Sequence, residues 1–231
     1  MNLLKKVFDR MDLQCSFLCG LISLMLLIRM PIFFMVGSSA SFFSLGSAIS
    51  PLAGYFGGVI GVVLYTILRF IWRLFFYSSF NDIFSISFLV HILPGWCATA
   101  YWVLPSIVGS VLLPLGAIFL FIVHPIGSQA YVYALLWCIP ILLQFLQYKK
   151  VTFADSFFVQ ALCATFAAHA VGSVLWLYGM PAMQPHTWIW LTPVALAERI
   201  FFAASMSIAR SVIVSILALP YVRRMRAQAI G

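Results

Sequence analysis

The sequence has few charged residues, and acidic residues are especially scarce. Charged side chains make up 8% of its 231 residues, 64% of the residues are hydrophobic, and the mean hydropathy is +1.09. A soluble domain of ordinary composition carries roughly a quarter charged residues. So few charges cannot cover the surface of a soluble globule, and we expect lipid to be the main solvent of the chain. No hydrophilic stretch is long enough to fold separately, so residues 1–231 are predicted to form a single integral membrane domain.

Motifs of known enzymes and metal sites are missing as well. The sequence contains no His-Glu-x-x-His zinc pair, no Gly-x-Ser-x-Gly nucleophile elbow and no Gly-Lys-Ser/Thr phosphate loop. The five cysteines lie in or beside apolar runs, where they are more simply small buried hydrophobes than a disulfide or metal framework. We therefore predict a protein that is not an enzyme and that has no metal and no cofactor.

The net charge of +8 comes from thirteen basic and five acidic residues. A basic balance can indicate nucleic-acid binding, but here the positive residues cluster at the edges of apolar runs. That placement is typical of cytoplasmic anchoring against anionic lipid head groups. The sequence therefore predicts a lipid bilayer, and no nucleic acid, as a partner.

Seven apolar stretches account for most of the chain. Each approaches or exceeds the ~20 residues that a helix needs to cross a membrane, and they predict an all-α, polytopic membrane helix bundle. The stretches cover residues 13–36, 50–76, 83–104, 106–123, 129–147, 156–178 and 188–219. The first is too long for the core of a cleaved signal peptide, so we expect it to stay as an uncleaved helix, although Ser38-Ser39-Ala40 could act as a weak cleavage site. The last is longer than a membrane requires and should tilt or extend beyond it.

The positions of the positive residues indicate that one apolar stretch does not cross the membrane. These residues form four clusters: Lys5, Lys6 and Arg10; Arg69 and Arg73; Lys149 and Lys150; and Arg223, Arg224 and Arg226. If all clusters are cytoplasmic, an even number of crossings separates each pair, yet three stretches lie between Arg73 and Lys149. We therefore predict six spans in the inner membrane, with both termini in the cytoplasm. The stretch 83–104 is the best candidate for a re-entrant or broken segment, because His91 is followed by Pro94-Gly95. Alternatively, 83–104 and 106–123 form one broken hairpin.

Small residues form faces on two of the expected helices. In the stretch 50–76, Gly54 and Gly58 form one Gly-x-x-x-Gly pair and Gly57 and Gly61 form another. Such faces let another helix approach closely. They predict either packing between helices of this chain or a docking surface for a partner membrane subunit. The stretch 156–178 repeats the four-residue spacing with Ala164, Ala168 and Gly172.

Charged residues inside apolar stretches are the best indication of a working site, since ionised groups are costly at bilayer depth. Glu198 is expected ~15 Å deep, near the midplane. Arg199 should project about 100° away around the helix, so we do not expect it to pair with Glu198. Arg29, in the stretch 13–36, is the candidate partner instead. Such a pair would be either a structural bridge or a clamp for a polar ligand group.

Two further places could contribute to binding. His169 has small neighbours and is either an interior hydrogen bonder or a ligand contact. The segment from His124 to Gln129 is predicted to be a turn that carries polar groups into an uncharged outer mouth. Aromatic residues near the outer boundary fit an interfacial belt, or less simply a stacking surface for a heterocyclic ligand; they are Tyr131, Tyr133, Trp137, Trp176, Tyr178, Trp188 and Trp190.

The segment Ser-Pro-Leu-Ala-Gly-Tyr-Phe-Gly-Gly-Val-Ile-Gly, residues 50–61, suggests a family. With the size, basic charge and six expected spans, it resembles the substrate-binding S components of energy-coupling-factor (ECF) uptake transporters. The resemblance implies uptake of a vitamin or metal ion, powered by separate ATPase subunits through a shared transmembrane coupling subunit. It implies that the glycine face docks that subunit. None of the family's vitamin-specific motifs is present, so the resemblance assigns no ligand contact.

The sequence thus predicts a solute-uptake protein that binds a small polar or heterocyclic molecule between Arg29, His124, Gln129, His169 and Glu198. Arg29 would meet an anionic or carbonyl group, and His169 and Gln129 would supply hydrogen bonds. Glu198 would hold Arg29 or face a ligand amine. The alternatives are an intramembrane enzyme acting on lipid, with a histidine as base, and a non-transporting membrane assembly subunit.

Overall fold

The structure is a computed structural model that describes residues 31–34, 42–76, 86–179 and 183–230, together with isolated helical residues between 14 and 22. Almost all of these residues are helical. The elements are β1 (Pro31–Phe34), β2 (Phe42–Ser44), α2 (Leu45–Ile49), α3 (Leu52–Phe76), α4 (Ile86–Ala100), the π-helix η2 (Val108–Leu112), α5 (Leu113–Val123), α6 (Pro125–Gln129), α7 (Tyr131–Ala134), the 3₁₀ helix η3 (Leu135–Trp137), α8 (Cys138–Tyr148), the 3₁₀ helix η4 (Thr152–Asp155), α9 (Phe157–Gly179) and α10 (Pro185–Ile230).

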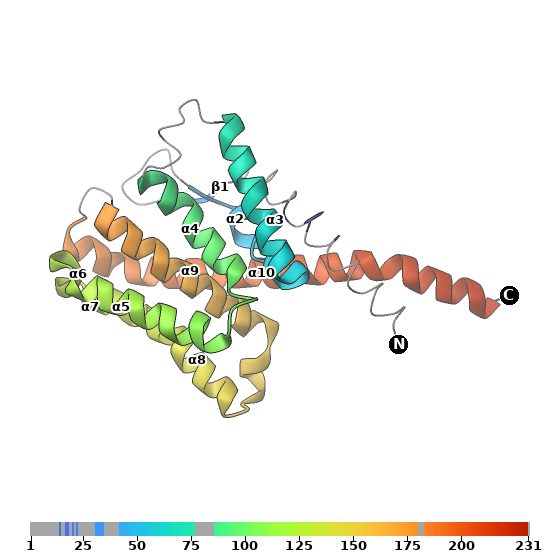
Figure 1. The fold of residues 1–231 in the computed structure, drawn as a ribbon. Coiled ribbons are helices and arrows are strands. Elements are labelled where there is room, and N and C mark those ends of the chain that lie inside the picture. The colour runs from blue at the N-terminus through green and yellow to red at the C-terminus, as the bar shows by residue number, and fades with distance from the viewer. Residues whose placement is uncertain are drawn as a thin grey trace.

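Helix α9 is the centre of the bundle. It contacts α4, α5, α8 and α10, and Figure 1 shows it lying between α4 on one side and α5 on the other. Its small residues permit these contacts: Ala164 and Ala168 are buried, and the ring of Pro94 in α4 lies where Gly172 has no side chain. The small-residue face predicted in the stretch 156–178 therefore serves packing within the chain at Gly172.

Two hydrophobic clusters fill the bundle. The first lies between α5, α7, α9 and α10 and includes Phe121, Trp137, Phe166 and Trp188. The second joins α2 and α3 to α9 and α10, and its buried residues are Ile49, Leu52, Ala161, Ala203 and Met206. Helix α10 therefore contributes buried residues to both clusters along one face.

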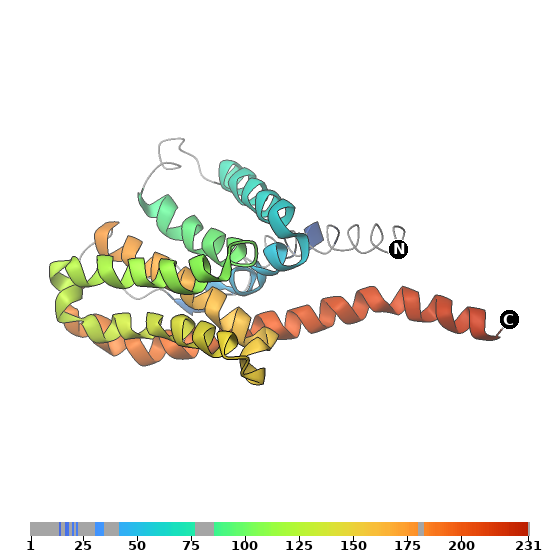
Figure 2. The same cartoon turned by 60° about the horizontal axis from the view of Figure 1, so that its bottom comes forward.

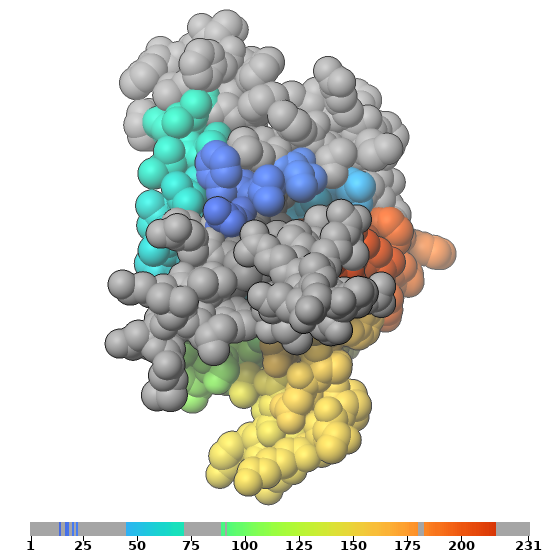
Figure 3. Space-filling view, turned by 90° about the vertical axis from the view of Figure 1, so that its right-hand side faces the viewer, coloured from blue at the N-terminus to red at the C-terminus, as the bar shows by residue number. Residues whose placement is uncertain are grey.

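Helix α10 is 46 residues long, which corresponds to about 69 Å. Figures 1 and 2 show that its last part continues well past the other helices. Figure 3 looks at the molecule from that end, and there the yellow segment around the α8–α9 connection also projects from the rest. Helix α10 thus extends beyond the bundle, while the expectation that the last apolar stretch tilts or extends into the cytoplasmic interface stays a prediction.

Four of the described helical segments are long and apolar enough to cross a membrane. They are Leu52–Ile71, Tyr131–Tyr148, Phe157–Gly179 and Pro185–Ser215, and the apolar helix Val108–Val123 is shorter. These match the stretches 50–76, 129–147, 156–178, 188–219 and 106–123 of the sequence. The structure is thus compatible with a helical membrane protein, while the count of six spans stays a prediction.

The stretch 83–104 is helical across the expected break. Helix α4 runs through Pro94 and ends at Ala100, and a turn follows at residues 101–104. The break therefore lies after Ala100 and not at Pro94-Gly95. One hydroxyl helps close the turn of helix after Pro94: Thr99 Oγ1 donates to the Gly95 carbonyl at 2.8 Å.

Two other expectations of continuous helix are wrong. Residues 31–34, at the end of the first predicted stretch, form strand β1, which pairs antiparallel with β2. Pro31 has no backbone N–H to donate within a helix, and the isoleucine and phenylalanines that follow favour extended structure. In α3, Gly58 adopts φ 54° and ψ −139° and kinks the helix, a conformation that glycine reaches without the penalty of a Cβ atom.

The close approach of α3 and α4 can be tested at Gly54. A Cβ atom there would overlap the backbone carbonyl of Thr99, whereas a Cβ atom at Gly116 in α5 would meet no atom within 4 Å. Gly54→Ala is therefore expected to lower stability by about 1–3 kcal/mol, since the backbone of α4 cannot easily move away. Gly116→Ala should be neutral or stabilising because alanine is the better helix former.

The measurement is the thermal unfolding midpoint of both purified variants in detergent. Equal midpoints for Gly54→Ala and the wild type would contradict the packing seen between α3 and α4.

Candidate functional site

A group of polar side chains lies inside the bundle between α7, α9 and α10. The hydroxyl of Tyr133 on α7 is 2.9 Å from Nε2 of His169 and 3.2 Å from Oγ of Ser173, both on α9. Since a phenol carries one proton, it can donate to only one of these atoms and must accept from the other if both bonds form. His169 and Ser173 are four residues apart, so both face the same side of α9. We call Tyr133, His169, Ser173, Glu198 and Arg199 the polar cluster.

Glu198 and Arg199 form an ion pair, contrary to the sequence-based expectation. Arg199 Nη2 lies 2.9 Å from Glu198 Oε1, and the two residues are only 4% and 7% exposed. The expectation compared the directions in which the two side chains leave the helix, which differ by about 100°. The arginine side chain is long enough to bring its guanidinium back to the carboxylate. Away from water, two opposite charges gain strongly from such a contact.

Arg199 has further partners that compensate its burial. Its Nη1 donates to the backbone carbonyl of Thr165 on α9 at 3.5 Å, and its guanidinium lies 4.5 Å from the ring centre of Phe202. Thr165 lies one turn before His169 on α9, so Arg199 contacts α9 close to the Tyr133–His169–Ser173 group.

Aromatic rings surround Tyr133. Its ring centre lies 4.9 Å from that of Trp188 and 5.9 Å from that of Trp137, and both tryptophans also pack edge-on against Phe121. Trp137 and Trp188 are fully buried. Assigning these residues and Tyr133 to an interfacial belt is therefore wrong, because they pack in the core. Tyr131, Tyr178 and Trp190 are exposed, as a belt requires.

Several polar atoms near the cluster are buried without a hydrogen-bond partner in the described part of the chain. They are Nε1 of Trp137, Nε1 of Trp188 and Oγ1 of Thr192. Thr192 lies on α10 one turn after Trp188 and between it and the ion pair in sequence. A buried donor without an acceptor is destabilising by about 1–3 kcal/mol, so these groups call for a partner.

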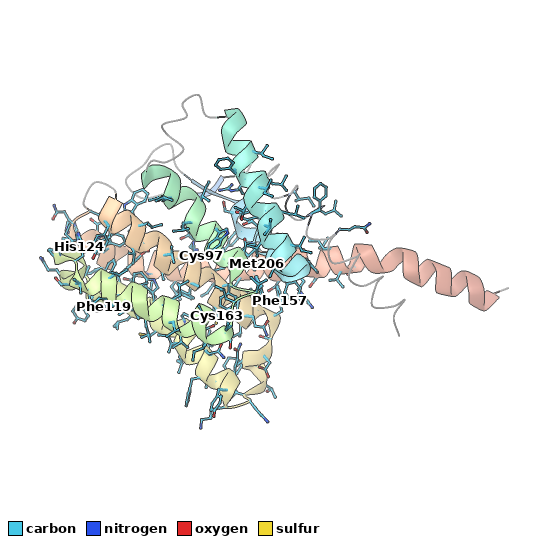
Figure 4. The ribbon with its side chains drawn as sticks, viewed as in Figure 1. Cys97, Phe119, His124, Phe157, Cys163 and Met206 are labelled. Atoms are coloured by element: carbon cyan, nitrogen blue, oxygen red, sulfur yellow. The ribbon has the colours of Figure 1, made fainter. Side chains whose placement is uncertain are left out.

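The segment predicted to be a turn is mostly the short helix α6, and its polar groups bond within it. His124 Nδ1 accepts from the backbone N–H of Ile126 and so caps α6. Gln129 is exposed, and its Nε2 donates to the Pro125 carbonyl at 3.2 Å. The imidazole of His124 packs against the ring of Tyr178. Figure 4 shows His124 at the end of the bundle opposite to Phe157.

Of the five residues predicted to bind a solute, the structure places His169 and Glu198 in the polar cluster. His124 and Gln129 lie at the end of the bundle, and Arg29 lies outside the described residues. Among the predicted docking glycines, Gly54 packs against Thr99 of the same chain. Gly57 and Gly58 are half-buried and Gly61 is buried; their docking role stays a prediction.

The predicted binding set left out Tyr133, Ser173 and Arg199, although Tyr133 was named among the aromatic residues and Arg199 as the charged neighbour of Glu198. The four-residue spacing of His169 and Ser173 could have identified Ser173. The position of Tyr133 depends on how α7 folds against α9, for which the sequence gives no local signal.

Comparison of the chain with protein-family models, with curated proteins and with solved structures finds no match. The likeness to S components therefore depends on the chain's own residues.

The hydroxyl of Tyr133 provides a test of the cluster. Tyr133→Phe removes the partner of both His169 and Ser173 inside the bundle and is expected to lower stability by about 1–3 kcal/mol. Tyr131→Phe is the matched control, because Tyr131 is 55% exposed and two residues away. The unfolding midpoints of both variants in detergent are the measurement. A midpoint for Tyr133→Phe as high as that of the control would show that the hydroxyl makes no such bonds.

Proposed function

We propose that this chain is the membrane component of an uptake system that binds a small polar or heterocyclic solute. The observation that carries the proposal is the polar cluster, which places a buried ion pair and hydrogen-bonding groups between three apolar helices. Ionisable groups inside membrane proteins are rare, and they mark substrate or ion pathways, proton relays and ligand counterions. In this proposal the chain crosses the inner membrane six times, with both termini in the cytoplasm.

The hydrogen-bond donors without partners around the cluster indicate which chemical groups a ligand would carry. The indole N–H groups of Trp137 and Trp188 can only donate, and the hydroxyl of Thr192 can do both. A solute with carbonyl or ring-nitrogen acceptors would complete them, and a flat solute could pack against the same rings. The carboxylate of Glu198 would orient a ligand N–H, with Arg199 keeping the site close to neutral.

Energy for uptake would come from elsewhere. The sequence holds no phosphate-binding loop, and its glycine-rich segment 50–61 resembles that of S components. We therefore propose that ATPase subunits act through a transmembrane coupling subunit, with a docking surface that includes the half-buried Gly57 and Gly58. Affinity purification of the chain from its own membranes should recover ATPase subunits. Recovery of the chain without them would favour a carrier driven by an ion gradient.

The main competing function is an intramembrane enzyme with His169 as base. Such a base needs an orienting group within hydrogen-bond reach. In the described part of the chain, the group bonded to its Nε2 is the hydroxyl of Tyr133. That arrangement favours binding over proton abstraction, because a neutral phenol does not raise the basicity of imidazole as a carboxylate does.

Thr192 separates ligand binding from stability. Its hydroxyl has no partner in the described structure, so Thr192→Val should leave the unfolding midpoint unchanged or raise it. If the hydroxyl bonds the solute, the variant should bind the solute about three- to tenfold more weakly. The measurement is native mass spectrometry of the purified protein, which reports the fraction of molecules that retain a small molecule.

Thr66→Val is the control, because the Thr66 hydroxyl already donates to Val62 in its own helix at 2.8 Å. Solute retention that is equal in the wild type and in both variants would refute a solute site beside Thr192. Absence of any retained molecule in the wild type, together with no uptake in membrane vesicles, would refute the proposed function.

A further inference from the structure

A second arginine, which is half-buried, lies apart from the polar cluster, at the other end of the bundle. Arg210 is on α10, one turn after Met206, and faces Phe157 at the start of α9. Figure 4 labels Met206 and Phe157 at the point where α10 leaves the other helices. Lys149 and Lys150 precede η4 and α9 and therefore lie towards the same end. Arg210 is within the apolar segment that ends at Ser215, so it is close to the edge of that segment.

The guanidinium of Arg210 is held in a fixed orientation by aromatic residues from two other helices. Its Nε donates to the hydroxyl of Tyr55 on α3 at 2.9 Å. Its central carbon lies 5.3 Å from the ring centre of Tyr55 and 4.8 Å from that of Phe157. Trp102 stacks on Phe157 at 5.3 Å and also contacts Tyr55. Because these contacts involve Nε and the planar face, they leave the two terminal nitrogens available.

In the described part of the chain, this site has more hydrogen-bond donors than acceptors. Within the described residues, no carboxylate pairs with Arg210; the ion pair found there joins Arg199 to Glu198. The Tyr55 oxygen accepts from Arg210 and still has its proton to donate. The indole N–H of Trp102 is buried without a partner in the same part of the chain. A ligand for this group of residues must therefore be an anion that only accepts hydrogen bonds.

We propose that Arg210, Tyr55 and Trp102 form a binding site for the phosphodiester of a phospholipid head group. Its two non-bridging oxygens match the planar pair of terminal arginine nitrogens, and such bidentate bonds are among the strongest in proteins. A lipid supplies the counterion at the depth where α10 leaves the apolar bundle. The acyl chains would lie against the apolar surface of α10 on the same side as Arg210, where Val214, one turn further along the helix, is exposed. This site is independent of the solute site.

The test uses the full chain in detergent with dioleoylphosphatidylglycerol as the probe, and native mass spectrometry counts bound lipid. Arg210→Gln removes the charge, and we expect its apparent dissociation constant for the lipid to rise about tenfold or more. Arg210→Lys keeps the charge but cannot bind with two parallel N–H groups, so its affinity should fall between the two. Lys149→Gln removes one positive charge at the same end, from an exposed side chain over Phe145, and should change affinity less than about twofold.

Millimolar inorganic phosphate distinguishes a lipid from a free anion. Phosphate should not displace the lipid, because it cannot replace the contacts of the acyl chains. Equal lipid affinity in the wild type, Arg210→Gln and Lys149→Gln would overturn the proposal. Displacement by phosphate alone would overturn the lipid assignment. If Arg210→Gln does not fold, Tyr55→Phe replaces it, since that variant keeps every charge and removes the bond to Nε; unchanged affinity there would count against the site.

Discussion

The neutralisation of buried charge governs how the helices of this bundle meet. Glu198 and Arg199 lie in the chain's apolar interior, where a single unpaired charge would be strongly destabilising. Their contact with each other pairs the two charges, and the Thr165 carbonyl of α9 accepts a further hydrogen bond from Arg199. For this to work, α10 must place residue 199 against the middle of α9. The contact of Arg199 with the Thr165 carbonyl therefore helps to fix the register of α10 on α9.

The small residues of α9 make that register possible. Ala161, Ala164 and Ala168 are buried and let other helices approach its backbone. Close approach brings the guanidinium of Arg199 within reach of a main-chain carbonyl, and it brings Tyr133 within 2.9 Å of His169. A larger residue in place of Ala164 or Ala168 would separate the helices and leave the polar groups without partners. The close spacing of the helices is thus required both for their apolar packing and for the contacts between their polar groups.

The sequence predicted the long helices well because twenty or more apolar residues are a local signal. It failed to predict the limits of the helices, because a proline begins a strand in one place and is tolerated inside a helix in another. Pro31 begins a strand where hydropathy alone predicted helix, whereas Pro94 lies inside a helix. The candidate site was predicted in part: His169 and Glu198 stand out as polar residues in apolar stretches. Tyr133 does not stand out, since its hydroxyl acquires a role only through contacts between segments far apart in sequence. The Glu198–Arg199 pair was misjudged because side-chain direction at Cβ says little about where a long side chain ends.

The two arginines of α10 show how depth and counterion are related. Arg210 follows Arg199 by eleven residues, which is about three turns, so both lie on nearly the same face of the helix, ~16 Å apart. The deeper arginine is only 4% exposed and has a carboxylate from its own chain. The other is half-buried, lies near the end of the apolar segment, and is oriented by a hydrogen bond to the Tyr55 hydroxyl and by two aromatic rings. A cation in the middle of an apolar layer must have an internal counterion, because no water or head group reaches it. At the edge, the surroundings can supply the anion, so the chain needs only to hold the guanidinium in position.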